Sequence, residues 1–157
     1  MKKYSHMLFA AGFGSILLGI YQIFLPVGLF YFVFVVFFAL CGEVCDLLDF
    51  KLYTEHERRF LSHSPLSPLL WLIAIASGIF SSLLHPSLGF FIGIATYLVI
   101  LTHLFLDSLN PSGVPLFSGK RIVVQHIPYD NWLWNFGFSL LGAFFLFMGY
   151  VLWFLFL

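Results

Sequence analysis

A histidine and an aspartate, His103 and Asp107, lie four residues apart near the end of a long apolar stretch. If the stretch is helical, this spacing puts both side chains on one face, where an imidazole nitrogen and a carboxylate oxygen can converge on a metal ion. Ionisable residues among apolar neighbours are costly in a membrane and usually face a bundle interior or a wet cavity. The pair therefore indicates a divalent-metal site; the alternative is a histidine that only packs and hydrogen-bonds.

Further metal-ligating residue types occur in other segments. Glu43, Asp46 and Asp49 follow one another at intervals of three residues, so a single helix face can present all three carboxylates. His6 lies near the N-terminus, and His63 lies in a linker that contains several charged residues. Each is a candidate that the fold would have to bring to the histidine–aspartate pair.

The helix that carries the pair is expected to stop at Asn110-Pro111, because proline cannot continue a helix. Gly113 follows in the turn and lets the backbone bend tightly. We therefore expect the loop to fold over the site, with Asn110 and Gly113 in contact with a bound substrate.

The linker that contains His63 includes the run HERRFLSHS. Arg58 and Arg59 are either anchors for lipid headgroups or ligands for a phosphate or carboxylate, and the sequence leaves both open. The position four residues after His56 is Phe60, so the His-Glu-x-x-His motif of zinc proteases is missing. The sequence also has no Gly-x-Ser-x-Gly elbow and no phosphate-binding P-loop, which argues against those classes of protein.

Five apolar stretches supply the elements that would hold these residues. Of the 157 residues, 61% are hydrophobic and only 9% charged, whereas a soluble domain has about a quarter charged. About 20 apolar residues cross the ~30 Å hydrocarbon core of a bilayer. The sequence therefore predicts an all-α, polytopic membrane protein that forms one integral membrane domain over residues 1–157. The predicted transmembrane helices cover residues 7–25, 27–45, 66–84, 87–106 and 132–157.

The positive charges predict the orientation of this bundle. With five spans, all seven lie on one side of the membrane: Lys2, Lys3, Lys51, Arg58, Arg59, Lys120 and Arg121. The positive-inside rule makes that side cytoplasmic, with the N-terminus inside and the C-terminus outside. All seven carboxylates and five of the six histidines share this side, and His85 lies on the other. The expected partner is the lipid bilayer; zero net charge and the lack of a basic run argue against nucleic acid.

The run HLFLDSLNPSGVPL resembles the signature of the YdjM-like family, inner-membrane proteins described as metal-dependent hydrolases and regulated by LexA in some members. That signature is His-x-x-x-Asp followed by a proline and a Gly-Val-Pro-Leu turn, and the sequence matches it from His103 to Leu116. The family also has a histidine in the first helix, which His6 resembles, and an acidic pair after the second, which Asp46 and Asp49 resemble. Its Arg-x-x-Thr-His-Ser element is similar to RFLSHS in this chain.

Two positions depart from the family pattern. The acidic pair of the family is Asp-x-Asp, whereas two residues separate Asp46 from Asp49. Arg58 stands where the family often has a histidine, and His56 lies two residues earlier. These departures leave open which aspartate is a ligand and whether His56 has a role.

The resemblance and the chemistry of these residues together predict a membrane-bound, metal-dependent hydrolase. The expected metal-binding residues are His63, His103, Asp107 and one of Asp46 or Asp49, with His6 as a further ligand or as a hydrogen-bond partner of one. Zinc suits histidine and carboxylate ligands, and manganese or iron is also chemically compatible. We expect Glu43 or Asp46 to accept a proton, Arg59 to hold an anionic group, and Arg58 to contact the substrate.

A lipid-linked ester or phosphoester at the inner leaflet is the expected substrate, because the predicted site lies level with the lipid headgroups. Two other functions stay open: a small carrier for metal ions or protons, and a structural or regulatory membrane protein without catalysis. The outer halves of the predicted spans contain no acidic or basic side chain that would continue a relay across the membrane. This pattern argues against the carrier.

Overall fold

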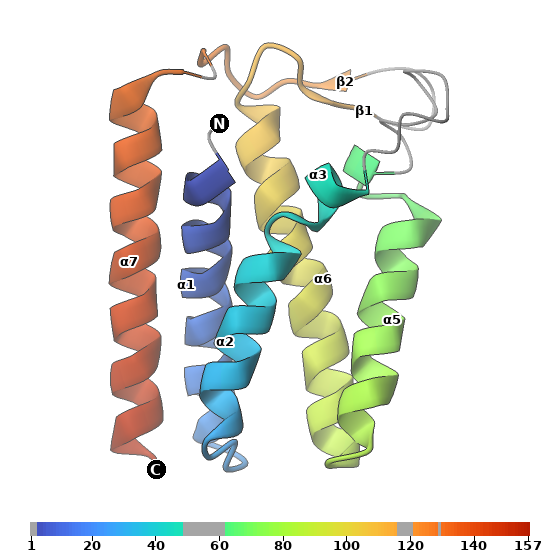
Figure 1. Ribbon diagram of the computed structural model, residues 1–157, viewed down its shortest axis with the longest axis vertical. Coiled ribbons are helices and arrows are strands. Elements are labelled where there is room, and N and C mark those ends of the chain that lie inside the picture. Colours follow the sequence, from blue (N-terminus) through green and yellow to red (C-terminus); the bar gives the residue numbers. More distant parts are fainter. Residues whose placement is uncertain (1–2, 49–61, 116–120, 129) are drawn as a thin grey trace.

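Five long helices form a bundle in the computed structural model, which describes residues 3–48, 62–115, 121–128 and 130–157. The helices are α1 (Lys3–Gln22), α2 (Phe30–Cys41), α5 (Pro68–Ser82), α6 (Pro86–Ser108) and α7 (Trp132–Leu155). They run alternately up and down, so the two chain ends lie at opposite ends of the bundle (Figure 1). The short helix α3 (Val44–Leu47) and the strands β1 (Val114–Pro115) and β2 (Arg121–Ile122) lie at the end that also holds the N-terminus.

Each predicted apolar stretch corresponds to one helix, but two of the helices are shorter than a full span. α1, α6 and α7 are long and apolar enough to cross a membrane. α2 has 12 residues and α5 has 15, which corresponds to lengths of only about 18 and 23 Å. The helical membrane architecture is thus confirmed, while the count of five spans and their orientation stay predictions. The antiparallel pair β1–β2 is a small departure from the all-α class.

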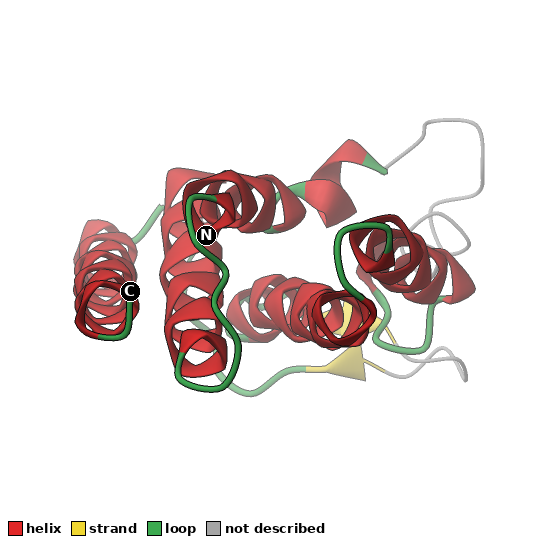
Figure 2. Cartoon of the chain, turned by 90° about the horizontal axis from the view of Figure 1, so that it is seen from below, coloured by secondary structure: helices red, strands yellow, loops and turns green. Residues whose placement is uncertain are grey.

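Glycines let the long helices approach one another closely. α7 packs along α1, where a Cβ added at Gly12 would collide with the backbone of Gly142. α5 packs on α6 in a similar way, because a Cβ at Gly89 would lie 2.6 Å from the carbonyl oxygen of Gly78. Seen along the bundle, α1 and α6 lie between α7 on one side and α5 on the other (Figure 2). These two inner helices are the ones that carry His6 and the histidine–aspartate pair.

The second predicted span ends earlier than expected. α2 stops before Gly42, and Glu43 leaves helical geometry with φ −112° and ψ −2° before α3 begins. α1 passes so closely here that a Cβ at Gly42 would lie 3.0 Å from the His6 carbonyl oxygen. The prediction that Glu43 and Asp46 share one uninterrupted helix face is therefore wrong. The turn instead lets α3 pack against α6.

The segment that follows β2 holds the C-terminal end of α6. The Val124 N–H donates to the Ser108 carbonyl oxygen, and the Ile127 N–H donates to the Leu109 carbonyl oxygen, both at 2.8 Å. These bonds satisfy carbonyl groups that a helix end leaves without an intrahelical partner. The connecting turn needs Gly113, whose φ is +60°. The loop thus folds back over the last turn of α6 and fixes its position.

Candidate metal centre

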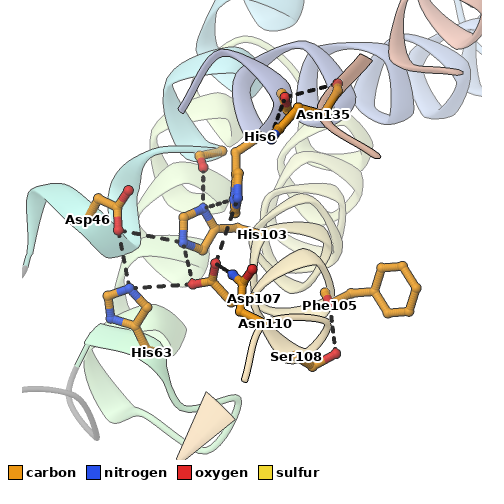
Figure 3. Close-up of polar contacts among 11 residues, drawn as sticks. His6, Asp46, His63, His103, Phe105, Asp107, Ser108, Asn110 and Asn135 are labelled. Carbon is orange, nitrogen blue, oxygen red and sulfur yellow. Dashed lines mark hydrogen bonds and ion pairs between the residues drawn. The ribbon is translucent and has the colours of Figure 1, made fainter. Parts of the chain in front are cut away.

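Four side chains from three segments meet at the end of the bundle that holds α3. His103 and Asp107 lie on the last turns of α6, Asp46 lies on α3, and His63 lies shortly before α5. Figure 3 shows two imidazoles and two carboxylates that point toward one another. The fold therefore brings the histidine–aspartate pair to two of the residues that the sequence proposed as its partners.

The ligand-type atoms of these four residues, here called the His-Asp ring, form a closed cycle. Asp107 Oδ2 lies 3.2 Å from His103 Nε2 and 3.7 Å from His63 Nε2. Asp46 Oδ1 lies 3.3 Å from His63 Nε2 and 3.9 Å from His103 Nε2. Around a zinc ion with bonds of about 2.0–2.2 Å, tetrahedral ligand atoms lie about 3.3–3.6 Å apart. The spacing of the ring therefore fits a divalent metal ion.

Buried polar atoms without a hydrogen-bond partner support the same assignment. In the described part of the chain these side-chain atoms are His6 Nε2, Glu43 Oε1 and His103 Nε2. Leaving such an atom unsatisfied costs about 1–3 kcal/mol, and His103 is only 1% exposed to solvent. A cation held by the ring would satisfy His103 Nε2, so the donor set and its unpaired atom both fit a metal site.

Hydrogen bonds at the second ring nitrogen orient both histidines of the ring. His103 Nδ1 donates to the Gly42 carbonyl oxygen at 2.6 Å. His63 Nδ1 lies 2.7 Å from the Ser62 hydroxyl oxygen. Metal-ligating histidines usually bond their second nitrogen in this manner, which fixes the ring and leaves Nε2 for the metal.

The electrostatic environment of the ring favours a cation. α2 and α6 both end at this end of the bundle, and the C-terminal end of a helix carries a partial negative charge. The contact with the imidazole of His63, and then the proximity of His103, lower the pKa of Asp46 below its usual value. Burial has the opposite effect on Glu43 and raises the pKa of its carboxyl group. The ring thus contains an ionised carboxylate, while Glu43 more readily holds a proton.

His6 and Asn110 approach the oxygen of Asp107 that faces away from the ring. His6 Nε2 lies 3.7 Å from Asp107 Oδ1, and Asn110 Nδ2 lies 3.5 Å from the same oxygen. His6 Nδ1 lies 2.8 Å from His103 Nδ1. Gly113 is farther along the loop, where it packs against the backbone of β2. Of the two predicted loop contacts, only Asn110 touches a ring residue.

Three predicted site residues lie outside the described residues: Asp49, Arg58 and Arg59. Of the two candidate aspartate ligands, the structure places Asp46 in the ring. Two groups that contact the ring histidines did not follow from the sequence, the Gly42 carbonyl oxygen and the Ser62 hydroxyl. Residue types do not reveal where a backbone carbonyl group will point, so the Gly42 contact could not be predicted. For the Ser62 contact, the only indication in the sequence was that Ser62 directly precedes His63.

Comparison with known protein families gives a match over the full length of the sequence. A family model described as "YdjM inner membrane protein" matches residues 1–157, the whole chain. No curated protein and no solved structure matches the chain. The match therefore covers every residue of the His-Asp ring.

Proposed function

The chain belongs to the YdjM inner membrane protein family, and from this premise we propose that it is a metal-dependent hydrolase of the inner membrane. One observation carries the proposal: each ligand atom of the His-Asp ring lies 3.2 to 3.9 Å from its two neighbours in the ring. Ion pairs that serve stability alone rarely leave a buried imidazole nitrogen without a hydrogen bond. Here His103 Nε2 makes no hydrogen bond of good geometry, and its nearest polar neighbours are the carboxylate oxygens of Asp107 at 3.2 Å and Asp46 at 3.9 Å.

The proposed ligands are the four residues of the ring. Two imidazoles and two carboxylates suit zinc, and manganese or iron is compatible with the same donors. Bound there, the metal ion would acidify a water molecule and supply a hydroxide near neutral pH. Asp49 stays a possible additional ligand from the family resemblance, since it lies outside the described residues.

Glu43 is the proposed proton acceptor. Its side chain is 7% exposed and its Oε1 has no hydrogen-bond partner. Burial raises its pKa, which moves a carboxylate closer to the neutral range in which a general base works best. Asp46 was the other candidate for this role, and its place in the ring favours a ligand instead.

The proposed substrate is a lipid-linked ester or phosphoester at the inner leaflet. Two observations support it: the ring lies at one end of the bundle, and the positive-inside rule places that end in the cytoplasm. Lys3 and Arg121 are cations at the same end, and Arg58 and Arg59 are proposed to hold an anionic group of the substrate. Asn110, beside Asp107, is the proposed loop contact.

The orientation is part of the proposal and has its own test. Five crossings put the N-terminus inside and the C-terminus outside, and the opposite positions of the two chain ends support an odd number of crossings. Reporter fusions at residue 3, near residue 85 and at the C-terminus should report inside, outside and outside. A cytoplasmic signal from the C-terminal fusion would contradict the five-span topology.

The hydrolase proposal is tested with purified, zinc-loaded protein in lipid nanodiscs. Release of phosphate or headgroup from inner-membrane lipid extracts is expected for the wild type and not for Asp107→Asn, which keeps the shape of the side chain. Equal release by the two proteins, or none from any ester or phosphoester with metal bound, would contradict hydrolysis. Transport of zinc into sealed proteoliposomes would then favour the carrier.

A further inference from the structure

We infer that His6 is not a metal ligand but positions two ligands, His103 and Asp107, through a fixed neutral tautomer. The inference rests on the proposed metal site and not on the proposed hydrolysis. The resemblance left His6 as either a ligand or a hydrogen-bond partner of one. Its contacts in the structure separate these two roles.

The contacts at His103 Nδ1 decide where its proton lies. This atom is 2.6 Å from the Gly42 carbonyl oxygen and 2.8 Å from His6 Nδ1. A carbonyl oxygen can only accept a hydrogen bond, so the proton must be on His103 Nδ1. The opposite assignment would place two lone pairs face to face at 2.6 Å. In neutral His103 the unprotonated nitrogen is then Nε2, as the proposed ligand role requires.

The same proton determines the tautomer of His6. Because His103 Nδ1 carries a hydrogen, His6 Nδ1 must turn a lone pair toward it, since two N–H groups at 2.8 Å would repel. Neutral His6 then carries its proton on Nε2. A protonated nitrogen cannot bind a metal, and His6 Nδ1 is occupied by His103, so neither nitrogen of His6 remains for a ligand bond.

The Nε2 proton of His6 faces the ring from outside. Its nearest charged partner is Asp107 Oδ1 at 3.7 Å, longer than a direct hydrogen bond but close enough for an N–H dipole to attract a carboxylate. The other oxygen of the same carboxylate, Oδ2, contacts both ring histidines. His6 thus acts on both ends of the α6 pair: it accepts from His103 and attracts the outward oxygen of Asp107.

The surroundings of His6 hold it in this position. It is only 3% exposed to solvent. Its own carbonyl oxygen lies against Gly42, the residue that accepts from His103. Groups of this kind around a metal ligand typically change affinity by about 10- to 100-fold when removed.

The test compares His6→Gln, His6→Leu and the wild type, each full length and loaded with zinc. Glutamine places an amide N–H near the position of the imidazole Nε2, whereas leucine keeps volume and removes both polar atoms. X-ray absorption spectroscopy counts the imidazole ligands, and competition with a chelator gives the affinity. Ser5→Ala is the matched control, because it removes the hydrogen bonds from the neighbouring α1 residue to Asn135 of α7, which do not touch the ring.

Two imidazole ligands are expected in every protein, with zinc affinity close to wild type for His6→Gln and Ser5→Ala. His6→Leu should bind zinc about 10- to 100-fold more weakly. Three imidazoles in the wild type that fall to two in His6→Gln would overturn the inference, as would unchanged affinity in His6→Leu. Two imidazoles without any hydrolytic activity would leave the inference standing and contradict only the hydrolase proposal.

Discussion

The two ends of the helix bundle differ in whether their buried polar side chains have hydrogen-bond partners. At the end away from α3, His85 Nδ1 lies 2.6 Å from the Ser87 hydroxyl, and the Tyr21 hydroxyl lies 3.0 Å from the same group. Gln22 donates there to the Phe156 carbonyl oxygen at 3.0 Å. These groups bond to one another or to the backbone, and they join segments that the chain brings together at that end.

The end that holds the His-Asp ring shows the reverse pattern. All three buried side-chain atoms that lack a hydrogen-bond partner in the described residues belong to His6, Glu43 and His103. Native proteins leave few buried polar atoms unpaired, and such atoms often mark a catalytic role or a missing ion. The comparison teaches that polar residues at the far end bond to one another or to the backbone, whereas this end leaves His103 Nε2 available for a metal ion and Glu43 Oε1 available for a proton.

The largest expected effect comes from Asp107→Asn, because Asp107 contacts three of the histidines around the site. The amide keeps the shape but loses the charge that attracts a divalent ion. We expect zinc affinity to fall by more than about 100-fold, since even the partners of ligands change it by 10- to 100-fold. Metal analysis of the purified protein measures this. If Asp107→Asn keeps the wild-type zinc content, Asp107 is not a zinc ligand, and the proposed specialisation of this end of the bundle for metal binding is contradicted.

Glu43→Gln is expected to separate catalysis from metal binding. The amide occupies the same buried space but cannot accept a proton, so kcat should fall by about 100- to 10,000-fold. Zinc content should stay at the wild-type level, because Glu43 is not part of the ring. Parallel measurement of kcat and zinc content is the test. A variant that loses zinc together with activity would place Glu43 among the ligands.

Gly113→Ala should destabilise the loop that covers the end of α6. The φ of +60° is unfavourable for alanine, and the new Cβ would lie 2.6 Å from the Ile122 carbonyl oxygen. We expect a loss of about 1–3 kcal/mol in unfolding free energy, measured by denaturant titration in detergent. Gly137→Ala is the matched control, since a Cβ at Gly137 meets nothing within 4 Å. Equal stability of both variants would contradict the role of the turn.

The smallest effect is expected at the far end, for Tyr21→Phe. The substitution removes one hydroxyl from the group around Ser87 and should cost only about 0.5–1.5 kcal/mol in unfolding free energy. Zinc affinity and kcat should not change, because the removed hydroxyl lies at the other end of the bundle. Isothermal titration calorimetry with zinc measures the affinity, and an activity assay measures kcat. A clear fall in zinc affinity would show that the two ends are coupled.

The amino-acid sequence alone determined the helical membrane class and the approximate position of every long helix. Uninterrupted apolar residues need a helix in lipid, since each backbone group must bond within its own segment. The pairing of His103 with Asp107 also followed from the sequence, because residues four apart share a face of any α-helix. Local geometry was sufficient for both.

The tertiary structure alone decided how the site is completed. Helix α2 ends at Gly42, where α1 passes close by, and the turn that follows brings Asp46 of α3 into the ring. The placement of His63 depends on a segment distant in the chain, and the role of His6 depends on a carbonyl oxygen of another helix end. Residue types and spacing carry no record of these contacts, because they arise only when separate helices pack side by side.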